Sequence, residues 1–273
     1  MIDVIVACGR NSLPYVQLMV NTIELTADFD TKFRFLLGVN DTPEYIPMAK
    51  QIKSKYKIEV FDCISPGEFS MGHGEALDLL MEHVDAEHCL VTDCDIVYLN
   101  QHWEKLMLEK IKDNIAIVGS QYDPNRKGEP KKYQNFPNVV TSIFKTQIIK
   151  DCNISFKPEE NAKRIIDINS ENQHVYGNDP GMKLDLDTGW QLCHNLKTNG
   201  YDGIPMPLRR KSAGQECQFL EEGTRGEEHW LDEMVLSSHA GRSYSRDLYS
   251  HPKALGWLEN VNNWFANMKH IRE

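Results

Sequence analysis

The chain has 273 residues, 41% of them hydrophobic and 26% charged, which fits a folded globular protein and excludes long disordered segments. A formal net charge of -10 disfavours broad electrostatic binding to nucleic acid, because an acidic surface repels phosphate backbones. The 7 cysteines include no Cys-x-x-Cys pair and indicate reduced, mostly buried thiols rather than a disulfide framework.

The N-terminal sequence gives no sign of export. Met1 leads directly into a short apolar run, without the basic and long apolar segments of a signal peptide. No stretch reaches the length of a membrane-spanning segment. The sequence therefore predicts a cytoplasmic protein, and the glycosylation sequons at Asn40 and Asn153 are expected to be chance matches.

The first 120 residues alternate between strand and helix patterns. Short runs rich in β-branched residues predict strands over residues 4–7, 32–39, 58–64, 89–92 and 115–119. Between them, apolar residues at helical spacing predict helices that begin at Ser12 and Thr42-Pro43, and further helices over 76–84 and 103–111. This order predicts an α/β fold with a mostly parallel central sheet and helices on both faces.

Beyond about residue 120 the alternation weakens. Residues 138–149 predict a strand that passes into a short helix, 157–183 a polar, loop-rich stretch, and 188–199 another helix. No linker divides the chain, so residues 1–273 are expected to form one domain. The last predicted element is a helix expected to pack on that domain as core or lid, with one apolar stripe: Trp257, Leu258, Val261, Trp264, Phe265 and Met268.

Two carboxylates follow the fourth predicted strand. Asp93 and Asp95 flank Cys94, so an extended chain would point both to the same side of the sheet edge. Carboxylates held that close repel each other unless a cation lies beside them, and such oxygen ligands suit Mg²⁺ or Mn²⁺ bound together with phosphates. Because parallel sheets bind ligands at the carboxyl ends of their strands, the position favours a metal site over an ordinary solvated turn.

The stretch from Gly72 to Leu106 resembles the donor-site segment of glycosyltransferases with the GT-A fold, especially their family 2-like group. It combines a helix, an apolar strand, an Asp-x-Asp motif and a helix that opens with tryptophan. Residues 4–12 resemble the first strand and nucleotide-contacting loop of these enzymes, and residues 38–44 their acidic turn after the second strand. The likeness covers residues 2–120 well and the remainder loosely. It implies a GT-A-type, Rossmann-like sheet with a loop-rich C-terminal acceptor region.

The resemblance implies a role for the residues that match its motifs. Asp93 would meet ribose or metal, and Asp95 would bind the metal. His73 would approach the base or ribose, with a capping or surface histidine as the alternative. The other residues expected to line the nucleotide, most often uridine diphosphate in such enzymes, are Ala7, Cys8, Gly9, Arg10, Asn40, Asp41 and Gly72.

Two acidic residues precede the helix predicted over 188–199. The run from Leu184 to Trp190 is similar to the motif that supplies the general base in inverting family 2-like enzymes, although the usual Glu-Asp pair is absent and the spacing to Gly200 differs. The resemblance assigns the base to Asp187, with Asp185 second. A helix N-cap is the competing interpretation of Asp187, and the two roles are compatible.

A histidine late in the chain is a candidate third metal ligand. Many proteins of this fold bring such a residue back to the metal, which points to His239, with His229 as the fallback and a structural histidine as the alternative. Arg242 or Ser243 would then contact the diphosphate.

Basic and aromatic residues offer further contacts. Basic clusters at Lys127, Lys131 and Lys132 and at Arg209-Arg210-Lys211 either form solvated turns or meet an anionic group of donor or acceptor. Three aromatic residues offer flat surfaces to a sugar or another ring: Tyr133, Tyr176 and Trp190.

These features predict a metal-dependent glycosyltransferase that uses Mn²⁺ or Mg²⁺ and a nucleotide diphosphate sugar, with a UDP-sugar as the leading candidate. Residues 1–120 would hold the donor and 121–273 the acceptor. A single displacement, with Asp187 taking the acceptor proton, would invert the anomeric carbon. The acceptor stays open between a glycan, a small molecule, a protein and, disfavoured by the acidic charge, a hydroxymethylated DNA base.

Three rival functions stay open. A retaining glycosyltransferase of the same fold would suit a site in which Asp187 does not reach the acceptor. A sugar nucleotidyltransferase would need a Gly-rich loop after the first strand, where this chain has one glycine, Gly9. A non-catalytic nucleotide-sugar-binding domain would bind the donor without turnover.

Overall fold

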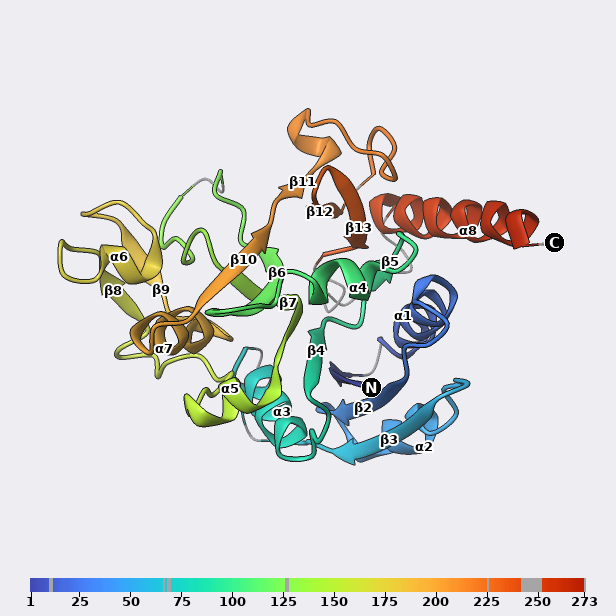
Figure 1. Ribbon diagram of the computed structural model, residues 1–273, viewed down its shortest axis with the longest axis horizontal. Coiled ribbons are helices and arrows are strands. Elements are labelled where there is room, and N and C mark those ends of the chain that lie inside the picture. The colour runs from blue at the N-terminus through green and yellow to red at the C-terminus, as the bar shows by residue number, and fades with distance from the viewer. Residues whose placement is uncertain are drawn as a thin grey trace.

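The computed structural model describes residues 1–9, 12–65, 67, 70–125, 128–224, 226–241 and 252–272. Its centre is a sheet of seven strands in the order β10-β6-β7-β4-β1-β2-β3 (Figure 1). All neighbouring strands run parallel except β7, which is antiparallel to both β4 and β6. The mostly parallel α/β sheet predicted from the sequence is therefore confirmed. The strands are β1 (Ile2–Cys8), β2 (Phe33–Val39), β3 (Lys57–Asp62), β4 (His88–Thr92), β6 (Ile115–Gln121), β7 (Pro137–Lys145) and β10 (Asp202–Met206).

Helices cover both faces of the central sheet. Successive residues of β1 enter opposite apolar cores, Val4 and Val6 one and Ile5 and Ala7 the other, as the two-residue period of a strand requires. One core contains the apolar sides of α1 (Leu13–Thr26) and α4 (Trp103–Leu108), and the other those of α3 (Ser70–Glu82), α5 (Thr146–Asp151) and α7 (Trp190–Thr198).

The helix predicted after Thr42 is much shorter than its apolar spacing suggested. A 3-10 turn over Pro43–Tyr45 is followed by α2 (Ile46–Ala49), which has only four residues. Pro47 accounts for the interrupted start, because it has no N–H to donate to the Pro43 carbonyl, but it lies in the first turn of α2 and does not cause the end after Ala49.

A second sheet, not predicted from the sequence, stands beside the central one (Figure 1). Its four antiparallel strands have the order β11-β12-β13-β5. β12 and β13 form a hairpin whose two turn residues, Asp232 and Glu233, have φ of 48° and 63°, the left-handed conformation that suits the twist of a tight hairpin. The strands are β5 (Ile96–Tyr98), β11 (Leu208–Arg209), β12 (Glu227–Leu231) and β13 (Met234–His239).

The remaining elements lie at the two ends of the view in Figure 1. A small sheet of β8 (Ile165–Asp167) and β9 (Lys183–Asp185) lies near α6 (Gln173–Tyr176), within the stretch expected to be loop-rich. At the other end, α8 (Pro252–Arg272) buries Trp257 and Val261 against a core that includes Tyr15. None of the described helices combines the length and the apolarity needed to cross a bilayer.

Candidate active site

Strand pairing brings Asp95 and His239 together. β5 begins directly after Asp95 and pairs with β13 so that Ile96 lies opposite His239. The Ala240 N–H donates to the Asp95 carbonyl at 3.1 Å, which fixes the two segments beyond the last strand pair. As a result, His239 Nε2 lies 3.2 Å from Asp95 Oδ1 and 3.5 Å from Asp93 Oδ2.

These three side chains form a group that fits a divalent cation. One ligand atom from each of Asp93, Asp95 and His239 lies within 4.8 Å of the others. Asp95 and His239 are buried, with 2% and 7% of their surface exposed. Two carboxylate oxygens and one imidazole nitrogen at the carboxyl edge of a parallel sheet are a suitable donor set for Mn²⁺.

Without a cation, bound protons offset negative charge in this group of side chains. Burial raises the pKa of Asp93 to about 7; the His239 charge lowers it, while the Asp95 charge adds to the rise. Burial alone would lower the pKa of His239, but the neighbouring carboxylates of Asp95 and Glu227 raise it well above its usual value. A divalent cation would replace these protons as the counter-charge.

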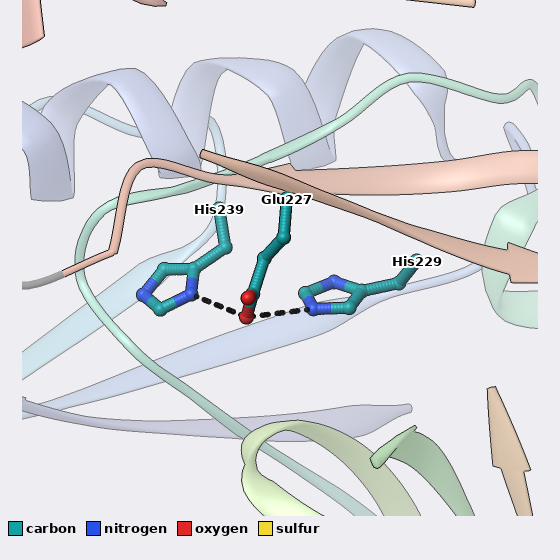
Figure 2. Close-up of side chains that lie close together, drawn as sticks. All are labelled: Glu227, His229 and His239. Carbon is teal, nitrogen blue, oxygen red and sulfur yellow. Dashed lines mark hydrogen bonds and ion pairs between the residues drawn. The ribbon is translucent and has the colours of Figure 1, made fainter. Parts of the chain in front are cut away.

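Glu227, which was not singled out in the sequence, lies between His239 and His229 (Figure 2). Glu227 and His239 are opposite each other in the β12–β13 hairpin, and His239 Nδ1 lies 3.1 Å from Glu227 Oε1. The fallback ligand His229 is two residues farther along β12, with Nε2 3.5 Å from the same oxygen and Nδ1 3.0 Å from Ser237 Oγ. The sequence signal was the alternation Glu-x-His and Ser-x-His in two short runs, which places all four side chains on one face of a hairpin.

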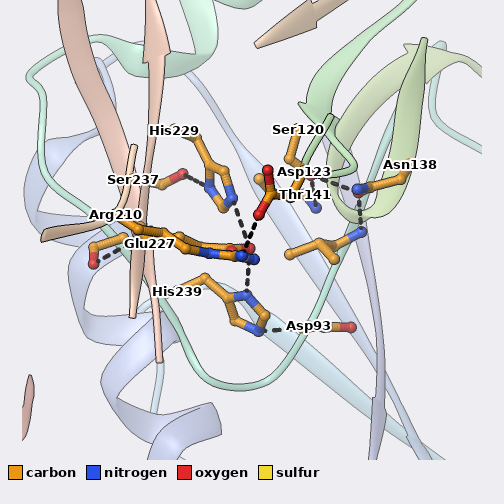
Figure 3. A network of polar contacts seen from close by, with 12 residues as sticks. Asp93, Ser120, Asp123, Asn138, Thr141, Arg210, Glu227, His229, Ser237 and His239 are labelled. Atoms are coloured by element: carbon orange, nitrogen blue, oxygen red, sulfur yellow. Dashed lines mark hydrogen bonds and ion pairs between the residues drawn. The ribbon is translucent and has the colours of Figure 1, made fainter. Parts of the chain in front are cut away.

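Arg210 binds the far side of Glu227 (Figure 3). Its Nε and Nη2 donate to Glu227 Oε2 at 3.0 and 2.5 Å, and its Nη1 donates to Asp123 Oδ2 at 2.5 Å. The sequence suggested that the basic cluster around Arg210 forms a solvated turn or meets an anionic group of donor or acceptor. Arg210 instead binds carboxylates of its own chain. We call Asp93, Asp95, Glu227 and His239 the donor-edge cluster.

The first turn of α3 lies against this cluster. His73 Nε2 is 3.8 Å from Asp93 Oδ1. Burial lowers the pKa of His73 to about 4 against the opposing effect of Asp187 and Asp95, so the ring is neutral at neutral pH. Gly72 is buried, and a Cβ there would lie 2.5 Å from the Gly67 carbonyl oxygen, so only glycine permits this approach of the loop to the helix.

The predicted base lies in a second group of charges, the paired cluster of Lys132, Arg164, Asp185 and Asp187. Arg164 donates to Asp187 Oδ1 at 2.7 Å, and Lys132 donates to Asp187 Oδ2 at 2.5 Å. The same two cations bind Asp185, each at 2.6 Å. Burial would raise the pKa of Asp187, but the charge and hydrogen bond of Lys132, together with hydrogen bonds from the Thr188 N–H and Ser70, lower it below its usual value. The N-cap interpretation of Asp187 is wrong, because α7 begins at Trp190 and its N-cap is Gly189.

The loop residues expected to line the nucleotide lie at adjoining strand ends. Ala7 and Cys8 end β1, and the Asn40 N–H after β2 donates to the Cys8 carbonyl at 3.1 Å. Ser12 stands at the N-cap of α1, but its hydroxyl bonds the Gly9 N–H and carbonyl at 2.8 and 2.7 Å instead of the helix. Asp41 follows Asn40 on the surface. Arg10, Arg242 and Ser243 lie outside the described residues.

Two of the three aromatic surfaces expected for the acceptor are core residues. Tyr133 and Tyr176 expose 1% and 3% of their surface, and their hydroxyls bond the Pro137 carbonyl and His194 Nδ1. That expectation was wrong for both, because their rings complete the core around α7. Trp190 is only partly buried, beside His194.

Comparisons with known proteins give limited matches. No protein-family model matches the chain. It is 27% identical over 109 residues to a dITP/XTP pyrophosphatase of Borrelia garinii, an alignment with 35% of this chain and 54% of that protein. The chain thus spans about half the length of the curated relative it matches.

The chain is similar in fold to several solved structures, including the following two. One is the mannosyltransferase PcManGT from Pyrobaculum calidifontis in complex with GDP-Man and Mn²⁺, at 12% identity and a TM-score of 0.49, over 76% of this chain and 54% of that one. The other is S. aureus TarS 1-349 in complex with UDP-GlcNAc, at 20% identity and a TM-score of 0.41, over 69% and 56%. The ligands named are those of these proteins.

Proposed function

We propose that this chain is a glycosyltransferase that moves a sugar from a nucleotide diphosphate donor to an acceptor hydroxyl with the help of a divalent cation. The observation that carries the proposal is the convergence of Asp93, Asp95 and His239 at the edge where β1, β2 and β4 end. Phosphates bound there would share a cation with these ligands. Residues 1–120 would hold the donor and 121–273 the acceptor.

Asp93, Asp95 and His239 would hold the cation. When bound, it would neutralise the diphosphate and so make the nucleotide a better leaving group. The imidazole favours Mn²⁺ over Mg²⁺, which prefers oxygen ligands. The nucleotide would contact the end of β1 at Ala7 and Cys8, the residues Gly9 and Arg10 that follow it, and Asn40 and Asp41 after β2. Gly72 and His73 would line the base or ribose, with Arg242 or Ser243 on the diphosphate. UDP is our leading candidate for the nucleotide.

Asp187 is the proposed base, with Asp185 second. It would take the proton of the acceptor hydroxyl while the oxygen attacks the anomeric carbon and the bond to the diphosphate breaks, so that the configuration inverts. Lys132 and Arg164 keep this carboxylate ionised but weakly basic, because both of its oxygens already accept hydrogen bonds. The acceptor hydroxyl would therefore replace one of these two cations at the carboxylate.

A donor-hydrolysis panel tests the function. UDP- and GDP-linked sugars would be incubated with the protein and Mn²⁺, with Asp95→Asn as control, and release of nucleoside diphosphate measured. Hydrolysis of a nucleotide sugar that the control lacks supports the proposal. Binding without turnover indicates a non-catalytic binding domain, and no binding of any nucleotide sugar rejects the proposal.

Two further measurements separate the other rivals. Adding dITP and XTP to the panel tests for a pyrophosphatase, the activity named for the matched Borrelia garinii protein. Proton NMR of a glycosylated product distinguishes inversion from retention at the anomeric carbon. A retained configuration would remove the role of Asp187 as base and leave the cation site in place.

A further inference from the structure

His239 faces acidic groups with both of its ring nitrogens. Nε2 points to Asp95 and Asp93, and Nδ1 lies 3.1 Å from Glu227 Oε1. A neutral imidazole carries one proton, so it can offer the lone pair of Nε2 to a cation only if the proton stays on Nδ1. A carboxylate beside Nδ1 selects that tautomer and also fixes the plane of the ring.

Glu227 is itself held from several sides (Figure 3). Two nitrogens of Arg210 bond Oε2, and Asp123 holds the same guanidinium from the other end. This leaves Oε1 facing the imidazoles of His239 and His229 (Figure 2). The side chain of Glu227 is only 12% exposed, so water competes little for these contacts.

A second cation between Glu227, His229 and His239 is the competing interpretation, because their ligand atoms also lie within 4.8 Å of one another. Two features oppose it. The Arg210 guanidinium already bonds the other oxygen of Glu227 and would repel a cation there. A cation on Nδ1 would also displace the proton that leaves Nε2 free as a ligand, so both sites could fill only if His239 lost both protons.

We propose that Glu227, held by Arg210 and Asp123, is the positioning residue that sets the tautomer and ring orientation with which His239 binds the catalytic cation. The inference rests on the proposed cation site at Asp93, Asp95 and His239. It predicts one cation per chain, with a histidine nitrogen in its coordination sphere. Outer partners of this kind typically change metal affinity by about 10- to 100-fold.

The test measures Mn²⁺ binding by titration calorimetry and the histidine nitrogen on Mn²⁺ by electron spin-echo modulation. We expect Glu227→Gln to bind Mn²⁺ about 10- to 100-fold more weakly and to weaken or lose the nitrogen signal. His239→Ala should lose the signal entirely. A signal that persists in His239→Ala, or a second Mn²⁺ per chain, would overturn the inference.

Glu228→Gln is the matched control. Glu228 neighbours Glu227 in β12 but lies on the opposite face, where it accepts the N–H groups of Phe219 and Leu220. This variant should lower the melting temperature and leave the Mn²⁺ affinity within about twofold, since it touches none of the proposed ligands. Equal losses of Mn²⁺ affinity in Glu227→Gln and Glu228→Gln would reduce Glu227 to a structural role and overturn the proposal.

Arg210→Gln covers the case in which Glu227→Gln does not fold. Arg210 is partly exposed, and its loss frees Glu227 without adding a buried charge at His239. We expect about 10-fold weaker Mn²⁺ binding. Wild-type protein that binds no Mn²⁺ would reject the cation site and this inference together, whereas wild-type affinity and nitrogen signal in Glu227→Gln or Arg210→Gln would reject the inference alone.

Discussion

The donor-edge cluster and the paired cluster each contain an Asp-x-Asp pair but balance its negative charge differently. In the donor-edge cluster, Glu227 pairs with one arginine, which is shared with Asp123, and the three carboxylates also contact the histidines His239, His229 and His73. In the paired cluster, two aspartates meet one lysine and one arginine, each bonded to both. The first arrangement leaves negative charge that a cation would balance, while in the second the basic side chains already balance the carboxylates.

The difference teaches how to separate carboxylates suited to a cation from carboxylates already paired with basic side chains of the same chain. An Asp-x-Asp spacing occurs in both places, at Asp93 and Asp95 and again at Asp185 and Asp187. What separates them is the partner each carboxylate finds in space. Four predictions test that contrast.

Removing a ligand from the donor-edge cluster should have the largest effect. We expect Asp95→Asn to lower donor turnover by at least about 1,000-fold. This exceeds the loss of rate that follows the removal of one hydrogen-bond donor to the charge of a transition state. The variant should fold, because the change removes a buried negative charge and keeps the shape of the side chain. The measurement is nucleoside diphosphate release with saturating Mn²⁺, beside circular dichroism; turnover within tenfold of wild type would contradict the assignment.

Breaking the paired cluster should instead cost stability. Lys132→Met leaves Asp185 and Asp187 with one basic partner, Arg164, between them. We expect the free energy of unfolding to fall by about 3 kcal/mol. This is the low end for a broken buried ion pair, because both carboxylates are partly exposed to water. Urea unfolding measures it. Asp93→Asn is the counterpart in the donor-edge cluster, and without metal it should leave stability unchanged or raised, since it removes a repulsive charge. Equal losses in both would erase the contrast.

The two protonated groups of the donor-edge cluster predict how stability depends on pH. Folding raises the pKa of Asp93 to about 7 and that of His239 well above its usual value, so each favours the folded state at low pH. Metal-free protein should therefore lose this stability as pH rises from about 4 through 7 and above. Mn²⁺ competes with these protons, so the rise in melting temperature that it causes should grow from pH 6 to pH 8. A constant or falling Mn²⁺ effect would count against the site.

The smallest effect should come from the neighbour of Arg210. The Arg209 guanidinium lies 3.8 Å above the Trp230 ring and pairs with the exposed Glu233. Arg209→Gln should cost about 0.5–1 kcal/mol in thermal unfolding, the range of an exposed cation–π contact. Its Mn²⁺ affinity should match that of wild type, because the Arg209 side chain contacts Trp230 and Glu233, which lie outside the donor-edge cluster. Weaker Mn²⁺ binding here would show that general damage to β11 is enough to disturb the site.

The sequence predicted the first half of the fold well because its signals are local. Each strand and helix from β1 to β6 except β5 shows its own apolar run or period, whereas the helix predicted after Thr42 ends at Ala49, earlier than its apolar spacing indicated. β5 has three residues, too few to show a period. The hairpin of β12 and β13 carries a polar face that turns inward to the donor-edge cluster, so it does not resemble an ordinary half-buried strand.

Partners from distant segments were beyond sequence reasoning. Nothing local indicates that Arg210 meets Glu227, or that Lys132 and Arg164 converge on Asp187 from separate loops. His239 was predicted to be a metal ligand only through the family resemblance. The strand register that brings it to Asp95 could be seen only in the structure. Tyr133 and Tyr176 were misplaced for the same reason, since their burial depends on segments far along the chain.

The pairing of β5 with β13 has a consequence for how the molecule assembles and opens. Asp95 and His239 lie far apart in the chain, so their contact is slow to form in folding and waits for the C-terminal hairpin to dock. We expect the hairpin to open as a cooperative unit while the central sheet stays intact. A cation held by Asp93, Asp95 and His239 would stabilise the docked hairpin, because the three ligands come together only when the hairpin is docked. Hydrogen exchange measures this stabilisation. We expect exchange of the β12 and β13 amides to slow when Mn²⁺ is added, while exchange of the β1 and β2 amides does not change.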